Sequence, residues 1–128
     1  HPMATQQVPF HIKSGLPFAK TITATLPNGR AWWTDTTQFE VLSQIREAAD
    51  VDSALIYDFF DDMTVTILGD VVTIELVVSG ANTRLITDSG YYDMVISDTF
   101  AVDDRGYVLI EGPVHRTTTT SSKAEETV

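Results

Sequence analysis

Residues 63–78 read MTVTILGDVVTIELVV, and this stretch decides the fold. Hydrophobic residues occupy every second position before and after Gly69-Asp70. Successive side chains of a β-strand point to opposite faces, so this spacing predicts two strands that each have one apolar face. Two such strands separated by a glycine-containing turn are typical of a β-hairpin. The segment is therefore expected to form one hairpin of an antiparallel sheet.

The same period of two recurs on both sides of this hairpin. Strands are also expected at residues 18–26, 38–46, 91–98 and 107–115, and at the mixed apolar run of residues 54–60. Polar and glycine-containing stretches separate them, and no alternation of strands with long helical patterns is present. The chain is therefore expected to be all-β, an antiparallel β-sandwich of the immunoglobulin-like type with about seven or eight strands. A closed barrel remains open as the alternative.

Some local features can be predicted within these segments. Residues 82–86 are expected to form one helical turn that crosses the end of the sandwich. In the strand at 91–98, Tyr92, Met94 and Ile96 are expected to face the core. Gly112-Pro113 indicates a bulge or an edge position in the last strand, because proline cannot donate a backbone hydrogen bond.

The chain has 128 residues, which fits one domain. His1 and Pro2 precede Met3 and are interpreted as a remnant of cloning. The last twelve residues, TTTTSSKAEETV, lack large apolar side chains and are expected to be disordered in the isolated protein. The expected order is cloning remnant, N-terminal arm, sandwich domain and tail, at residues 1–2, 3–17, 18–116 and 117–128. Within the arm, residues 8–14 are either an extra strand or an extended segment.

Charge and composition exclude several classes of partner. Eight Lys and Arg residues stand against 18 Asp and Glu residues, which gives a formal net charge of −10. Such a chain repels nucleic-acid phosphates and anionic membranes, so neither is an expected partner. No apolar stretch approaches the roughly 18 residues that a membrane helix needs. The absence of cysteine excludes disulfides and thiolate metal sites, and suits a reducing cytoplasm.

No motif for catalysis or cofactor binding is present. The sequence has no nucleophile elbow, no phosphate-binding glycine loop and no dinucleotide fingerprint. Residues 50–53, DVDS, resemble a fragment of a calcium loop but lack its glycine and closing glutamate, so these aspartates are interpreted as turn formers. His11 and His115 are far apart in sequence and are interpreted as ordinary surface histidines unless the fold brings them together. We expect no enzyme activity, no cofactor and no metal site.

Two pairs of adjacent aromatic residues are the candidate interaction residues. Trp32-Trp33 and Tyr91-Tyr92 each place neighbouring rings on opposite faces if they lie in strands. An exposed ring of this kind can stack on a sugar or anchor a protein interface. The alternative interpretation is that both tryptophans cover the open end of the sandwich, since tryptophan is highly buried on average.

A particular order of segments carries a resemblance to a known family. In chain order the segments are Gln44-Ile45-Arg46, Ala54 to Asp58, the hairpin at 64–78, Asn82 to Leu85, Gly90 to Ile96, and Gly112-Pro113-Val114. This order resembles the small β-sandwich modules of tailed-bacteriophage virions, of the immunoglobulin-like or baseplate-upper-protein N-terminal type. Such modules occur in tails, necks, fibres and capsid decorations, and the resemblance implies no catalytic residue.

The expected function is therefore structural. The resemblance implies a virion protein, made in the host cytoplasm, that assembles with other virion proteins as a homo-oligomer or in repeated copies. Strand edges and terminal arms are the expected contacts, with residues 6–14 and the threonine-rich tail becoming ordered on assembly. The alternative is a carbohydrate-binding module in which Trp32 or Trp33 stacks on a glycan.

Overall fold

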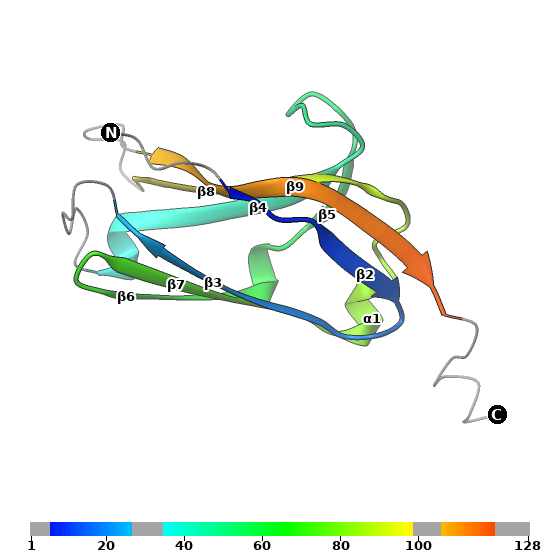
Figure 1. The fold of residues 1–128 in the computed structure, drawn as a ribbon, viewed down its shortest axis with the longest axis horizontal. Coiled ribbons are helices and arrows are strands. Elements are labelled where there is room, and N and C mark those ends of the chain that lie inside the picture. The colour runs from blue at the N-terminus through cyan, green and yellow to red at the C-terminus, as the bar shows by residue number, and fades with distance from the viewer. Residues whose placement is uncertain (1–5, 27–34, 99–105, 120–128) are drawn as a thin grey trace.

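The computed structural model describes residues 6–26, 35–98 and 106–119. Its strands form two separate sheets packed face to face, so the chain is a β-sandwich and not a closed barrel (Figure 1). The larger sheet has the order β1-β9-β8-β4-β5, with β2 also paired to β9, and the smaller sheet has the order β3-β7-β6. This is the strand arrangement of immunoglobulin-like sandwiches. The strands are β1 (Gln6–Gln7), β2 (Phe10–Ser14), β3 (Phe18–Thr25), β4 (Phe39–Arg46), β5 (Leu55–Asp58), β6 (Met63–Leu68), β7 (Val71–Val78), β8 (Gly90–Asp98) and β9 (Gly106–Thr118).

The hairpin predicted at 63–78 is confirmed. Strands β6 and β7 pair without a register shift from Met63 opposite Leu76 to Leu68 opposite Val71. Gly69 adopts a φ of 62° in the turn between them, a left-handed conformation that glycine adopts at little cost. The alternating positions Val72, Ile74, Leu76 and Val78 of β7 face the other sheet and are fully buried, as the alternation predicts.

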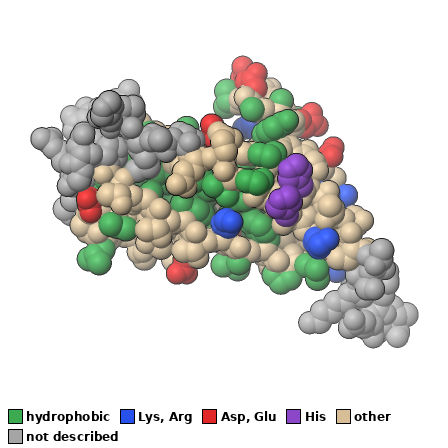
Figure 2. Space-filling view, in the orientation of Figure 1, with side chains coloured by type: hydrophobic (Ala, Val, Ile, Leu, Met, Phe, Trp, Pro, Cys, Tyr) green, Lys and Arg blue, Asp and Glu red, His purple; other side chains and the backbone are tan. Residues whose placement is uncertain are grey.

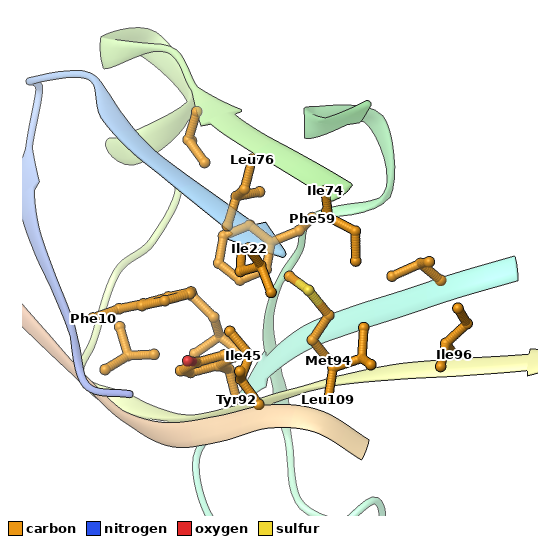
Figure 3. Packing of buried hydrophobic residues seen from close by; sticks show 14 of the residues in the cluster. Phe10, Ile22, Ile45, Phe59, Ile74, Leu76, Tyr92, Met94, Ile96 and Leu109 are labelled. Atoms are coloured by element: carbon orange, nitrogen blue, oxygen red, sulfur yellow. The ribbon is translucent and has the colours of Figure 1, made fainter. Parts of the chain in front are cut away.

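The core lies between the two sheets and is built from these alternating positions (Figure 3). Tyr92, Met94 and Ile96 face it as predicted, with no more than 4% of any of these side chains exposed. Phe10 is central: its ring stacks on Tyr92 with centroids 3.9 Å apart and meets the edge of Phe59 at 6.2 Å. Burying an aromatic side chain of this size contributes roughly 1.5–3 kcal/mol to folding.

The N-terminal segment belongs to the sandwich and is not a separate arm. Strands β1 and β2 pair in parallel with β9, with Phe10 opposite Val114 and Ser14 opposite Thr118. Phe10 and Ile12 are 1% and 0% exposed, so removal of this segment would open the core. The domain boundary expected at residue 18 is therefore too late, and the fold also contains a parallel pair. At the other end, β9 extends to Thr118, beyond the boundary expected at residue 116, while residues 120–128 lie outside the described ranges.

A single turn of helix holds the link in which the chain crosses from β2 of the larger sheet to β3 of the smaller sheet. Helix α1 (Gly80–Thr83) confirms the predicted helical turn, displaced by two residues. The Thr83 hydroxyl is fully buried, accepts from the Gly15 N–H at 3.0 Å and donates to the Leu16 carbonyl at 2.9 Å. Gly15 has a φ of 88°, which lets the chain turn sharply between β2 and β3. No helix within the described ranges is both long and apolar enough to cross a membrane.

Pro113 leaves one backbone hydrogen bond between β9 and the N-terminal segment unmade, and the Tyr92 hydroxyl replaces it. In a parallel pair, a strand residue donates to the residue before its partner and accepts from the residue after it. The Val8 N–H donates to the Glu111 carbonyl at 2.8 Å, so the Val8 carbonyl faces residue 113, which is a proline without an N–H. The Tyr92 hydroxyl donates to this carbonyl instead, at 2.6 Å.

Gly112 provides the space for this arrangement. It lies directly opposite Tyr92 in the β8–β9 pair, and a Cβ added to Gly112 would lie 2.6 Å from the Val8 carbonyl oxygen. The tyrosine side chain therefore passes from β8 across β9 to Val8, in the link between β1 and β2. The bulge or edge position expected at Gly112-Pro113 is wrong in both alternatives, because β9 lies between β8 and the strands β1 and β2, and the register shift of the β8–β9 pair lies at Met94-Val95.

Removing the Tyr92 hydroxyl should destabilise the fold. Tyr92→Phe leaves the half-buried Val8 carbonyl without a donor, and we expect a loss of about 1–2 kcal/mol in the free energy of unfolding. Urea denaturation followed by circular dichroism measures it. Tyr91→Phe is the matched control, because Tyr91 is 47% exposed, and it should change stability by less than about 0.5 kcal/mol. Equal effects of the two substitutions would contradict the role given to the Tyr92 hydroxyl.

Candidate interaction surfaces

The structure describes two of the four aromatic residues predicted to mediate interactions, and of these two Tyr91 is the exposed one. Tyr91 points away from the core on the outer face of the larger sheet and is 47% exposed. Tyr92 is 4% exposed, and its hydroxyl is bonded within the sheet, so it is part of the core and was wrongly included. Trp32 and Trp33 lie outside the described residues.

Tyr91 borders a groove on the outer face of the larger sheet. Gln44, Asp93 and Glu111 lie in one row across β4, β8 and β9, and the loop at residues 48–51 forms the groove's wall. The cavity has a volume of about 200 Å³. One exposed aromatic ring beside several hydrogen-bonding side chains is an arrangement that can bind a small polar ligand.

The groove has an acidic floor. Asp93 and Glu111 are directly opposite one another on neighbouring strands, a position at which like charges repel. Burial, and then the Glu111 carboxylate, raise the pKa of the Asp93 carboxyl, and the nearby Arg46 guanidinium opposes this only in part. Arg46 itself donates to the Ser53 carbonyl and to Gln44 Oε1, each at 2.8 Å. The floor therefore offers acceptors to hydroxyl or ammonium donors.

Asp50, in the loop at residues 47–53, acts as a turn former. The Asp50 carboxylate accepts from the Asp52 N–H at 3.0 Å, and the Ser53 hydroxyl donates to the Ala48 and Asp50 carbonyls. This local bonding accounts for Asp50 and Ser53 of the DVDS segment. Within the described ranges, no group of three or more His, Asp and Glu side chains is arranged to hold a metal ion.

The edge strands of the two sheets differ in how they are protected. Lys20 lies on the core-facing side of β3, and an inward-pointing charge discourages a further strand from pairing there. The edge formed by β1 and β2 is interrupted at Pro9, and β5 has only four residues. Strand β6, at residues 63–68, has no charged residue and no proline, and in the described part of the chain it pairs only with β7. It is the least protected of these edges.

Acidic residues stand at both ends of β6. Asp61 and Asp62 precede the strand, and Asp70 follows it in the turn to β7. A strand that added to this edge would place its own ends near these carboxylates. An extended segment with basic residues at its ends therefore fits better than a second copy of β6, whose acidic ends would repel them.

His11 and His115, which the sequence left far apart, lie side by side. They are paired positions on β2 and β9, and their rings stack with centroids 5.0 Å apart and planes inclined by 19°. Figure 2 shows them as one exposed patch. They border a surface hollow of about 360 Å³ that Lys13, Leu16, Pro17 and Thr117 also line. No local motif could have revealed this pair, because only the parallel register brings it together.

Comparisons with known proteins are limited to the fold. No family model matches the chain, and no curated protein matches it. Among solved structures, the ASH / PapD-like domain of human CEP192 (PapD-like domain 7) is similar over 91% of this chain and 84% of that chain, with 5% sequence identity and a TM-score of 0.40. The architecture described above rests on the strand order of this chain.

The charge on Asp93 should lower stability at neutral pH. A raised pKa means that the folded chain binds this proton more tightly than the unfolded chain, so stability falls as pH rises through the carboxyl range. Asp93→Asn should therefore stabilise the protein at pH 7, by less than about 1 kcal/mol because the group is partly exposed. The gain should vanish near pH 3, where carboxyls are largely protonated.

Urea denaturation at the two pH values measures this difference. Glu40→Gln is the matched control, because Glu40 lies on the same sheet face opposite Ser97 and no carboxylate faces it across the β4–β8 pair. A stabilising effect of Asp93→Asn that is equal at both pH values would contradict the electrostatic explanation.

Proposed function

We propose that this chain is a structural protein of a tailed-bacteriophage virion that acts by protein–protein assembly. It would serve in a tail, neck, fibre attachment or capsid decoration, after synthesis in the host cytoplasm. The virion assignment rests on the order of segments that resembles virion β-sandwich modules. The observation that supports assembly is the edge of β6, which is the least protected sheet edge among the residues that the structure describes.

An added strand would gain both hydrogen bonds and buried surface at β6. The outer edge of a strand presents backbone N–H and C=O groups that an extended peptide can pair with, which is the mode called β-augmentation. The core-facing residues of β6, Met63, Val65 and Ile67, are only half-buried, although their partners on β7 are fully buried. A fourth strand would cover the open side of these three side chains and add apolar burial to the backbone pairing.

The partner that fits this edge is an extended segment of another virion protein with basic residues at its ends. The carboxylates of Asp61, Asp62 and Asp70 would attract Lys or Arg side chains there. Repeated copies of the domain would then be arranged by the protein that supplies the segment. A homo-oligomer remains a prediction, and light scattering of the full chain over a range of concentrations measures it.

Strand addition at β6 can be tested with a synthetic peptide. The probe is an alternating threonine–valine heptapeptide with a lysine at each end, and a glutamate-ended peptide is its control. Only the lysine-ended peptide should shift the backbone amide NMR signals of β6, and salt should weaken its binding because the attraction is electrostatic. Binding of both peptides with equal affinity, or signals shifted mainly on β3, would contradict the proposal.

Two variants of the chain sharpen the test. Val65→Lys copies onto β6 the inward-pointing charge that β3 carries at Lys20, and should lower peptide affinity by about tenfold or more. Lys20→Thr removes that charge from β3 and should create a second edge that binds the peptide. Circular dichroism establishes that both variants remain folded.

A second candidate function, carbohydrate binding, is favoured by the groove at Tyr91. Its exposed ring lies beside Asp93 and Glu111, whose carboxylates can accept hydrogen bonds from sugar hydroxyls. Tyr91 is therefore a candidate platform in addition to Trp32 or Trp33, which the sequence suggested.

The two locations for a sugar site can be distinguished by mutation. A glycan that binds the full chain should lose about tenfold or more in affinity on Tyr91→Ala if the groove is the site, since ring stacking is lost. Calorimetric titration of glycans found by array screening measures this. Loss on Trp32→Ala or Trp33→Ala, with Tyr91→Ala unchanged, would contradict binding in the groove.

A further inference from the structure

We propose that His11 and His115 together form a binding site for a divalent transition-metal ion such as Zn²⁺, Ni²⁺ or Cu²⁺. This inference is independent of the proposed virion function. It rests on the placement of two exposed imidazoles at directly paired positions of β2 and β9, with ring centroids 5.0 Å apart.

The spacing suits two ligands of one ion. Metal–nitrogen bonds to histidine are about 2.0–2.1 Å long, so two ligating nitrogens must approach within a few ångströms of each other. Both side chains stand on the solvent face of their strands, and the planes are now inclined by only 19°. Rotation of each ring about its Cβ–Cγ bond turns one nitrogen of each toward a shared position above the sheet.

The residues around the hollow select the class of ion. Among the described residues, its lining contains two imidazoles but no carboxylate, so it suits Mg²⁺ and Ca²⁺, which prefer oxygen ligands, poorly. Imidazole suits zinc, nickel and copper. The part of the chain that the structure describes supplies two ligands, and water, or the same histidine pair of a second copy, completes the coordination. The Lys13 ammonium opposes any cation in the hollow, so the affinity should be modest.

Calorimetric titration of the full chain with zinc chloride at pH 7.5 tests the site. All measurements are made in a His1→Ala background, because His1 lies outside the described residues and is itself able to bind metal. His11→Gln and His115→Gln should each weaken zinc binding by about tenfold or more, because the second imidazole binds at high effective concentration. Magnesium chloride and calcium chloride should give no heat of binding.

Lys13→Gln should change the zinc affinity in the opposite direction from the histidine substitutions. Removing the ammonium should tighten zinc binding, whereas Lys20→Gln, on the neighbouring β3, should change it little. Affinity that falls on Lys13→Gln would overturn the electrostatic account of the hollow. Zinc binding that is unchanged by both histidine substitutions would overturn the site itself.

A stability measurement gives a second readout. Only the folded chain holds the histidines of β2 and β9 close enough to bind one ion together. Zinc should therefore raise the thermal unfolding midpoint. This rise should be absent in the His11→Gln and His115→Gln variants. Light scattering with and without zinc shows whether a second copy completes the site: a zinc-dependent dimer or a zinc-bound monomer each supports the site, whereas no zinc response in mass, heat or midpoint overturns it.

Discussion

The parallel pairing of β1 and β2 with β9 is the interaction on which the rest of this structure depends. It forms one edge of the larger sheet, places Phe10 and Ile12 in the core, and brings together residues 104 positions apart. The pairing is interrupted at Pro113, and a polar gap beside the core would be costly. The Tyr92 hydroxyl closes that gap by bonding to the Val8 carbonyl, and it reaches the carbonyl because Gly112 has no side chain.

Protection against unwanted strand pairing is unevenly distributed over the sandwich. An inward-pointing lysine protects β3, and a proline interrupts the edge of β1 and β2. Strand β6 has neither device within the residues that the structure describes, and its core-facing side chains remain partly open to solvent. Because the whole chain is strongly acidic, electrostatic repulsion opposes random association, while a basic segment would still be attracted to this edge.

The strands were largely predictable because their signal is local. Alternation in residues 63–78 and 91–98 reports which side chains face the core without knowledge of the strand's neighbours. The first strands were harder, since Phe10 and Ile12 are only two alternating positions beside prolines and polar residues. The structure also separates the two adjacent tyrosines. The alternation that exposes Tyr91 on the outer face of the sheet buries Tyr92 in the core.

The sequence by itself determined an all-β domain without cysteine, its hairpin at 63–78 and the core-facing positions of its main strands, because these follow from composition and a period of two. Only the tertiary structure decided which strands became neighbours. The contact between His11 and His115, the facing carboxylates of Asp93 and Glu111, and the open edge of β6 all follow from strand order and register. Such contacts join residues distant in sequence, and a local pattern contains no information about its pairing partner.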